Sequence, residues 1–392
     1  MSSGRKGLPD GEEEGFMNRR RVTVAVAAAG VVAGVTGLGV LAMPAGAGPA
    51  PVLPDVTAES LVESVITAEP AAFGGSVDVD NDLGVPALAG IPQLSDGASS
   101  LRMWTDGAGR VRVQLPAGES EKTFVDDGAT SWLWDSAEQT VQKVTRDAAA
   151  KRERPVEGVP SDPVTLARDV VTHVQEFSDV TVDGTARVAG RSAYELVLTP
   201  KPTERTVLRE VRVAVDAELR APLRVSVLTN GTNAPAVQVG FSELTVGPQD
   251  PALFAFTPPA GAEVTEVRPQ DVSERDRTAA ERALTEADPQ VVGEGWDAVL
   301  VARVPADALA NLDPRRAEDG RERDGREWEG RGERGADVQG LLRQLGKQVS
   351  GPWGSGTLVT ARVGGVLIAD DGRVAVGAVP EQVLTEAIGQ VK

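Results

Sequence analysis

The stretch VRVAVDAELRAPLRVSV, residues 211–227, holds two alternating runs joined by a turn, and it decides the fold class. In its first run, Val211, Val213 and Val215 occupy every second position, and charged residues such as Arg212 stand opposite them. Side chains two residues apart share one face of a β-strand, so this spacing predicts strands with one apolar and one polar face. The stretch therefore predicts two neighbouring strands of an antiparallel sheet.

Similar alternating runs continue on both sides of this stretch, from about residue 101 to 246. Asp-Gly at 106–107 and 127–128 and Ala-Gly at 189–190 separate successive runs. Asp-Gly between two alternating runs is a strong hairpin signal. We therefore expect most of these strands to follow one another in a single antiparallel sheet.

Two amphipathic helices are expected to cover the apolar face of this sheet. DVTAESLVESVITAE, residues 55–69, has an apolar stripe and either Thr57 or Asp55 as its N-cap. SDPVTLARDVVTHVQEF, residues 161–177, begins with Asp162 as N-cap and proline at the next position. A sheet with one apolar face and only two such helices must curl on itself or carry the helices across it. The predicted fold class is α+β with a curved antiparallel sheet.

The C-terminal part, residues 268–392, is expected to form a smaller α+β module. WDAVLVARV predicts a strand, Asp-Gly at 371–372 a hairpin, and residues 381–388 a last helix. Residues 312–337 alternate charge and glycine with almost nothing apolar, which predicts a disordered insertion. Spacing leaves open whether these strands form a separate sheet or extend the first one.

Composition removes several kinds of chemistry. The 392 residues include no Cys and one His, so disulfides, thiolate chemistry and imidazole clusters as metal sites are excluded. His173 is expected to be an ordinary helix residue, and no residue pair is placed to activate a nucleophile. A formal net charge of −18 disfavours nucleic acid as a partner. We therefore expect a protein that is not an enzyme and needs no cofactor or metal.

The N-terminus has the organisation of a targeting segment. Residues 1–21 form a cytoplasmic n-region that ends in three arginines, and residues 22–43 are uncharged and mostly apolar. The uncharged run serves either as a cleaved signal peptide or as a retained transmembrane anchor. Residues 44–56 are a linker rich in Pro, Ala and Gly. Both alternatives place the rest of the chain outside the cytoplasm, in the cell envelope or secreted.

Trp132 and Trp134 lie two residues apart in a chain whose aromatic content is only 4%. In a strand both indoles point to the same face. One interpretation is cross-strand packing that stabilises the sheet. The others are a cavity wall beneath the helices and an exposed pair for partner binding. Trp104 would lie near them if strands 101–105 and 130–135 are neighbours.

The loop LGVPALAGIPQLSDG, residues 83–97, repeats apolar residues at every third position although it is too rich in Pro and Gly for a helix. These residues are Val85, Leu88, Ile91 and Leu94. One interpretation is a loop tucked against the core. The alternative is a mobile flap over a cavity mouth, or an edge at which a partner docks.

Four segments resemble, in this order, the LolA-like superfamily: GATSWLWDSAEQTVQKV, AGRSAYELVLTPK, VRVAVDAELRAPLRVSV and FAFTPPAGAEV. The likeness covers roughly residues 56–267 and is greatest to actinobacterial members, which carry a signal or anchor segment and an extra C-terminal part. The superfamily includes lipoprotein carriers and RseB-like envelope regulators. The resemblance implies a half-open antiparallel barrel, here residues 57–267, with helices across its mouth and an apolar cavity for acyl chains.

On this resemblance, the first function we expect is an exported binding protein whose cavity holds an acyl chain, a lipid or a lipidated protein. The alternative is an RseB-like regulator that docks a membrane protein such as an anti-sigma factor, through the flap loop or the C-terminal module. The expected wall of the cavity consists of seven apolar residues: Trp104, Val113, Trp132, Trp134, Leu196, Val213 and Val225.

Overall fold

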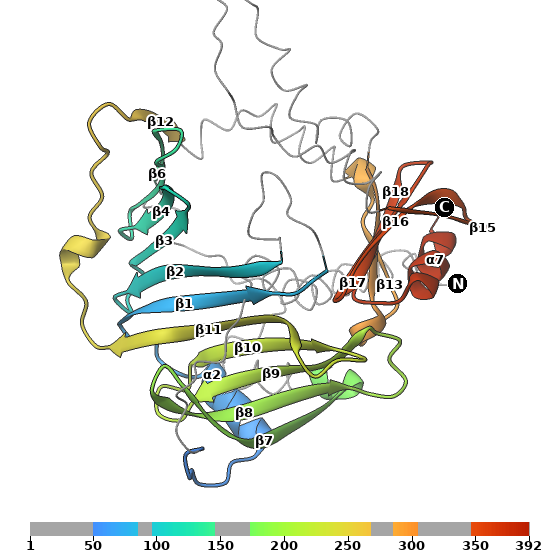
Figure 1. Cartoon of the computed structure of the whole chain (residues 1–392), viewed down its shortest axis with the longest axis horizontal. Coiled ribbons are helices and arrows are strands. Elements are labelled where there is room, and N and C mark those ends of the chain that lie inside the picture. The colour runs from blue at the N-terminus through green and yellow to red at the C-terminus, as the bar shows by residue number, and fades with distance from the viewer. Residues whose placement is uncertain (1–49, 85–95, 146–172, 268–284, 305–345, 392) are drawn as a thin grey trace, which may run out of the picture.

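The computed structural model describes residues 50–84, 96–145, 173–267, 285–304 and 346–391. The strands of this part of the chain form three sheets of six strands each (Figure 1). The targeting segment, the flap loop and the glycine-rich insertion predicted from the sequence lie outside these residues. Within them, no helix is both long and apolar enough to cross a bilayer.

The first sheet contains the stretch that opens the sequence argument. Its strands are β1 (Phe73–Asn81), β7 (Ser178–Val188), β8 (Arg191–Pro200), β9 (Leu208–Asp216), β10 (Pro222–Thr229) and β11 (Pro235–Val246). They lie in the order β1-β11-β10-β9-β8-β7, and every neighbouring pair is antiparallel. Val213 pairs with Val225 across β9 and β10, so the valines of both runs share one face, as predicted.

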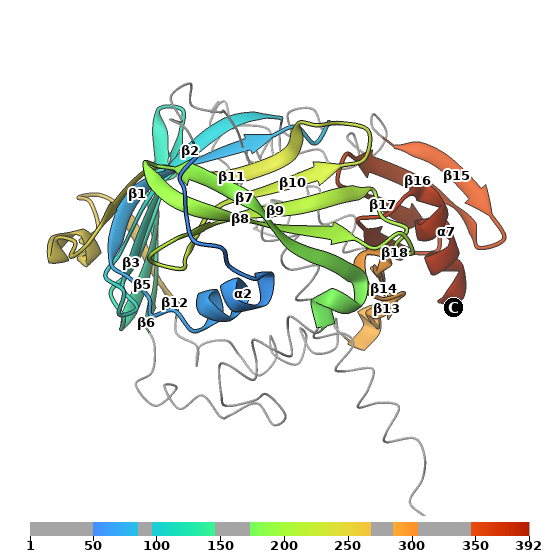
Figure 2. The same ribbon diagram turned by 90° about the horizontal axis from the view of Figure 1, so that it is seen from below.

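The second sheet continues the first, because β1 lies beside β2 (Figures 1 and 2). Its strands are β2 (Gly97–Thr105), β3 (Val111–Ala117), β4 (Ser120–Asp126), β5 (Thr130–Asp135), β6 (Thr140–Thr145) and β12 (Glu263–Val267), in the order β12-β6-β5-β4-β3-β2. Figure 2 shows the two sheets together as an arch that does not close into a barrel. The predicted fold class, α+β with a curved antiparallel sheet and a smaller C-terminal part, is confirmed.

The hairpin signals are confirmed in detail. Asp106 accepts hydrogen bonds from the backbone N–H groups of Ala108 and Arg110, both at 2.8 Å, and closes the β2–β3 turn. Gly107 and Gly128 adopt φ values of +74° and +92° at the two Asp-Gly turns. Such values are accessible to glycine at little cost, so the residue type fixes the turn and the turn fixes the strand register.

A segment that we call the strap, residues 247–262, leaves β11 and runs along the outer face of β2–β5 to reach β12. It contains the short helix η3 (Pro251–Phe254). Phe254 is buried and contacts the Arg110 guanidinium at 5.1 Å, and Arg112 donates to the carbonyl of Leu253 at 3.2 Å. β12 then pairs with β6 in parallel, the exception among the described pairs. The sequence did not predict β12, because its partner is set by the path of the strap and not by local alternation.

Helix α2 (Ala58–Ile66) covers part of the concave face of the arch (Figure 2). Its N-cap is Thr57, one of the two residues that the sequence offered, and it accepts from the backbone N–H of Ser60 at 3.2 Å. Leu61 of this helix is fully buried against Tyr194 and Leu196. Of the second predicted helix, only residues 173–177 fall within the described part of the chain, and they are helical.

The C-terminal module is a separate sheet, which resolves the alternative that spacing left open. Its strands are β13 (Gln290–Val292), β14 (Val299–Arg303), β15 (Lys347–Gly351), β16 (Gly354–Ala361), β17 (Gly364–Ala369) and β18 (Arg373–Gly377), in the order β13-β14-β18-β17-β16-β15. The short helix η4 (Gly295–Asp297) precedes β14. Helix α7 (Glu381–Gln390) packs on one face of this sheet through Val383, Leu384, Ala387 and Ile388.

The module is held against the arch by polar and apolar contacts. The indole N–H of Trp296 donates to the Ser178 hydroxyl at 2.7 Å, and its backbone N–H donates to Glu204 at 2.8 Å. Arg362 forms an ion pair with Asp82 at 2.5 Å at the end of β1. These contacts join the module to both edge strands of the first sheet, to β7 through Ser178 and to β1 through Asp82. The module therefore has a defined position beside the arch.

Candidate functional site

A row of apolar side chains crosses the concave face of the arch. Strand register pairs Leu196 with Val213, Val213 with Val225, and onward across β11 and β1. The same cluster continues into β2 and β3, and the register carries it to β4 and β5. Directly paired residues share one face of a sheet. We call this set the apolar row: Leu196, Val213, Val225, Val239, Val79, Met103, Val113, Phe124 and Leu133.

Solvent exposure is greatest at the β4–β5 end of the apolar row. Leu196 is 7% exposed beneath α2 and Val79 is 3% exposed, whereas Phe124 and Leu133 are 37% and 43% exposed. Beside this open end, Lys122 and Asp135 form an ion pair at 3.0 Å on the same face. The open end is thus an apolar surface with a charged border, which suits binding of apolar matter and supplies no reactive group.

The three predicted tryptophans lie on the opposite, outer face. Trp132 pairs with Val125, and the register places Trp134 and Trp104 on the same face as both. The strap covers this face: the Trp132 ring lies 5.6 Å from that of Phe256, and the Lys143 ammonium lies 5.6 Å from the Trp132 ring. The two indoles therefore share a face, as predicted, and that face is not the concave one.

Trp104 lies against β1 and not beside the other two tryptophans, because β3 and β4 separate β2 from β5. A Cβ atom added at Gly74 would come within 2.5 Å of the Trp104 ring, so this close approach requires glycine. Gly74 and Trp104 thus help to join the two halves of the arch.

The seven predicted wall residues are therefore divided between two faces. Val113, Leu196, Val213 and Val225 belong to the apolar row, and their contact with a ligand stays a prediction. The tryptophans do not join them, because period two fixes which residues share a face but not which face is concave. Phe124 and Leu133 were missed. Leu133 stands between Trp132 and Trp134, so the same alternation assigns it to the other face.

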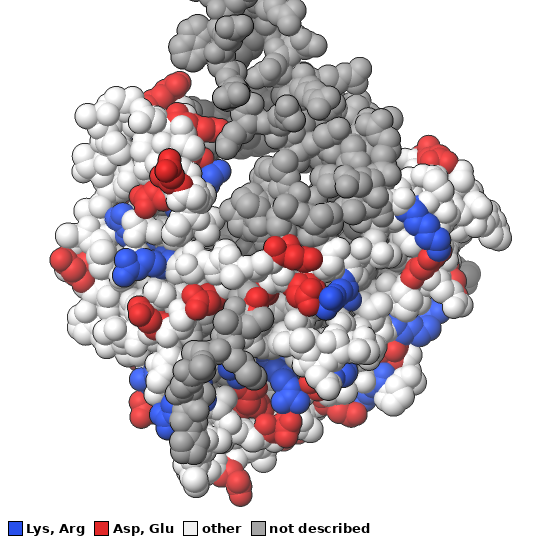
Figure 3. Space-filling view, viewed as in Figure 1, with Lys and Arg blue, Asp and Glu red and all other residues white. Residues whose placement is uncertain are grey.

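The outer face of β7–β11 is polar. Arg224 forms an ion pair with Glu195 at 2.6 Å, and Arg212 forms one with Glu210 at 2.9 Å. Figure 3 shows basic and acidic side chains interspersed over this part of the surface. Within the described ranges, no three His, Asp or Glu residues lie together as a metal site would require. Because positive and negative side chains alternate on the outer face of β7–β11, this face is typical of a solvated surface and not of a binding patch of one charge.

Asp80 on β1 is a carboxyl group whose pKa is raised well above its ordinary value. Burial, and then the negative charge of Asp82, raise its pKa to about 6. Its Oδ2 atom is buried without a hydrogen-bond partner within the described part of the chain. A carboxylate that is deprived of water and lies near a second negative charge favours its neutral form.

We expect Asp80→Asn to stabilise the protein at pH 8 by about 1–2 kcal/mol. The folded state binds the Asp80 proton more tightly than the unfolded state does. Stability of the wild type therefore increases as pH falls through about 6, and the advantage of the variant should vanish near pH 4. Urea unfolding at a series of pH values measures this. Asp78→Asn, an exposed position on the same strand, is the control; a pH-independent effect of Asp80→Asn would contradict the assignment.

The comparisons with known proteins concern the fold. No protein-family model and no curated protein matches the sequence. Among solved structures, the chain is similar to one from the Pseudomonas aeruginosa MucA/MucB complex, with 16% identity, 84% of this chain and 96% of that chain covered, and a TM-score of 0.39. It is also similar to MucB, with 18% identity, the same coverages and a TM-score of 0.38.

A LolA-superfamily protein from Nitrosomonas europaea is similar over 52% of this chain and 99% of its own, with 13% identity and a TM-score of 0.22. The structural neighbours thus include MucB and LolA-superfamily proteins, as the sequence resemblance predicts. The greater likeness to actinobacterial members stays a prediction. At these TM-scores the likeness carries no functional inference, so the function is argued from this chain's own residues.

Proposed function

We propose that this chain is an extracytoplasmic, non-enzymatic binding protein whose apolar row holds an acyl chain, a lipid or a lipidated protein. The observation that best supports this proposal is that an unbroken apolar row on a concave face ends in two solvent-exposed side chains, Phe124 and Leu133. Burial of apolar area contributes about 25 cal/mol per Å². A linear hydrocarbon that lies along the row would remove both side chains from water.

The targeting segment supports the proposed location. A basic n-region followed by an uncharged run places the arch and the module on the far side of the cytoplasmic membrane, where lipids and lipidated proteins are the abundant apolar ligands. Retention of residues 22–43 as an anchor would hold the apolar row close to that membrane. The N-terminus of the mature protein distinguishes a cleaved signal from an anchor.

A fluorescent long-chain fatty acid tests the proposed site. We expect Leu133→Asp to weaken its binding by about tenfold, because a carboxylate on the row must be desolvated beside the hydrocarbon. Val264→Asp is the matched control: Val264 is 47% exposed, close to the 43% of Leu133, but it lies on β12, paired with Val141 on the outer face. Fluorescence titration of both variants and the wild type measures the difference.

Two results would contradict the proposal. One is an equal loss of fatty-acid binding in the Leu133 and Val264 variants. The other is native mass spectrometry that finds no bound lipid on protein purified from cells and no exchange with added lipid. Loss of binding in Leu133→Asp alone, with unfolding curves that match the wild type, supports the apolar row as the site.

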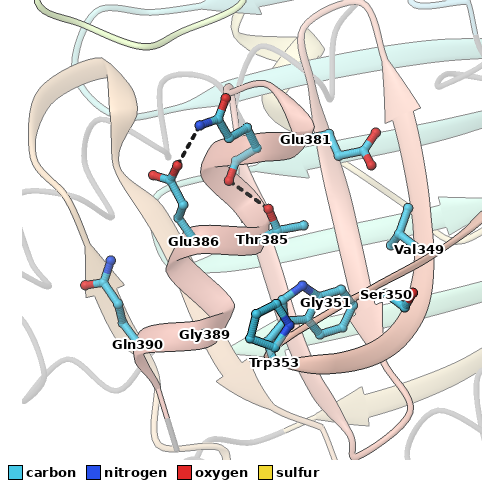
Figure 4. Close-up of a pocket in the computed structure, with 11 residues that line it drawn as sticks. Val349, Ser350, Gly351, Trp353, Glu381, Thr385, Glu386, Gly389 and Gln390 are labelled. Carbon is cyan, nitrogen blue, oxygen red and sulfur yellow. Dashed lines mark hydrogen bonds between the residues drawn. The ribbon is translucent and has the colours of Figure 1, made fainter.

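A second candidate function is an envelope regulator that docks a membrane protein. It is favoured by the C-terminal module, which is fixed to the arch and carries an open groove between the β15–β16 hairpin and α7 (Figure 4). Photo-crosslinking in cells distinguishes the two. One stoichiometric membrane partner that requires the module supports the regulator, whereas many lipidated partners support the carrier.

A further inference from the structure

The sheet of the C-terminal module is apolar on both of its faces. Helix α7 packs on one face, where Val299, Val301 and Leu367 are fully buried. Strand register places five aliphatic side chains in one row on the opposite face. We call this row the module face: Val291, Leu300, Val376, Val366 and Val359.

The module face differs from a sheet face that is built for water. The row beside it contains Ala302, Val374 and Ile368, and none of these side chains is charged. An antiparallel sheet with one face in water carries polar residues there, as the outer face of β7–β11 does with its ion pairs. Yet Val376 is 42% exposed, whereas Ala375 next to it is fully buried. The module face is therefore a partly exposed apolar surface, which is typical of a binding site.

The module face is continuous with the apolar row of the arch. Ala361 lies two residues after Val359 on β16, so the two side chains share a face. Ala361 packs in one hydrophobic cluster with Val213 and Val225 of the apolar row, and Trp296 belongs to the same cluster. A set of apolar contacts thus leads from the concave face of the arch to the module.

The dimensions and chemistry of the module face fit one acyl chain. The row crosses five neighbouring strands, from β13 to β16, which is about 19 Å at the usual strand spacing. One acyl chain spans half of the hydrocarbon core of a bilayer, about 15 Å. The five side chains offer no hydrogen-bonding group. A peptide that lay there would lose water from its backbone without gaining partners, whereas a hydrocarbon would not.

We propose that the module face holds one acyl chain of a diacyl glycerolipid whose other chain lies on the apolar row. This inference rests on the proposed function and specifies its ligand as a lipid with two chains. The chains of such a lipid are joined at one end, and the two surfaces meet at the cluster that holds Ala361, Val213 and Val225. Once the first chain is bound, the second binds at a high effective concentration.

Two fluorescent lipids with the same headgroup, one with two acyl chains and one with a single chain, test this inference on the full-length protein. We expect Val376→Asp to weaken binding of the diacyl lipid by about tenfold, because its carboxylate must be desolvated beside the second chain. Binding of the single-chain lipid should not change, since the longer apolar row holds it. Val264→Asp is the matched control, 47% exposed on the outer face of β12, and should bind both lipids as the wild type does.

Val376→Leu keeps the module face apolar and should bind the diacyl lipid as the wild type does. Equal binding of the diacyl lipid to wild type and Val376→Asp would overturn the inference, and so would an equal loss for both lipids. In either case the proposed function would stand if Leu133→Asp weakened binding of both lipids. If neither lipid bound the wild type, both proposals would be wrong.

Unfolding curves and sedimentation identify the other occupants of the module face. Because Val376 is exposed, the unfolding curve of Val376→Asp should match that of the wild type. A strongly destabilised variant would show that another segment of this chain covers the module face. A wild-type dimer that Val376→Asp dissociates would show that a second copy covers it. Each of these two results contradicts binding of an acyl chain there.

Discussion

Replacement of Asp216 by Ala is expected to destabilise the protein by about 3–5 kcal/mol. Asp216 is fully buried at the end of β9. Arg191 forms a two-pronged ion pair with its carboxylate, and the backbone N–H groups of Glu218 and Leu219 each donate to it at 2.8 Å. Removal of the carboxylate leaves two turn N–H groups without their acceptor, and it leaves the partly buried guanidinium with only the exposed carboxylate of Glu218, at 3.0 Å, as a partner.

Urea unfolding measures this effect, with Asp179→Ala on β7 as an exposed control expected to change stability by less than about 0.5 kcal/mol. Arg191→Met should restore part of the loss in the double variant, because no partly buried guanidinium is then left without its buried partner. Equal stability of the Asp216 and Asp179 variants would contradict the assigned role.

The same carboxylate links stability to pH. Burial opposes its ionisation, but the hydrogen bonds from Arg191 and from the backbone of Leu219 and Glu218 prevail and lower its pKa. The unfolded state therefore binds this proton more tightly, so the contribution of Asp216 is present above the ordinary carboxyl pKa and is lost as pH falls through the lowered value. Asp80 has the opposite sign, so the two groups act in opposite directions in acid.

Local features of the arch were predictable because they depend on neighbours in the chain. Alternation at Val211, Val213 and Val215 fixed a strand, and Asp-Gly at 106–107 and 127–128 fixed two turns. Thr57 marks the start of a helix because its side chain accepts a hydrogen bond from the backbone N–H of Ser60, three residues later in the chain. Each of these needs only the geometry of a few consecutive residues.

The choice of face was not predictable, because it depends on contacts between distant segments. Trp132 lies on the outer face since the strap returns more than a hundred residues later and places Phe256 against it. Without the strap, two indoles in an aromatic-poor chain look like a cavity wall. Leu133 looks unremarkable in sequence, and only the direction in which the sheet curls turns it into exposed apolar surface on the concave side.

The groove of the C-terminal module was missed for a similar reason. The sequence GPWGSGT, residues 351–357, predicts only a turn into a strand, and the structure has that turn between β15 and β16. The helix that forms the opposite wall begins about thirty residues later. Arg373 on β18 brings the two walls together, which no local pattern indicates.

Arg373→Met is expected to destabilise the protein by about 2–4 kcal/mol and to open the end of α7. The Arg373 side chain is buried and donates to the carbonyls of Ile388 at 2.5 Å and Val391 at 2.6 Å, and to that of Trp353 at 2.7 Å. The last carbonyls of a helix have no partner within the helix, so this guanidinium satisfies them. Met fills much of the same volume but donates no hydrogen bond.

Because Arg373 joins the end of α7 to the hairpin that carries Trp353, its loss should affect the groove as well as stability. We expect faster amide hydrogen exchange in the last turn of α7, with fatty-acid binding at the apolar row unchanged. Arg303→Met is the matched control, since Arg303 pairs in register with Arg373 but is exposed. Equal exchange rates in the two variants would show that α7 holds its position without the guanidinium, and the groove would then depend on the apolar contacts of Leu384 and Ile388 alone.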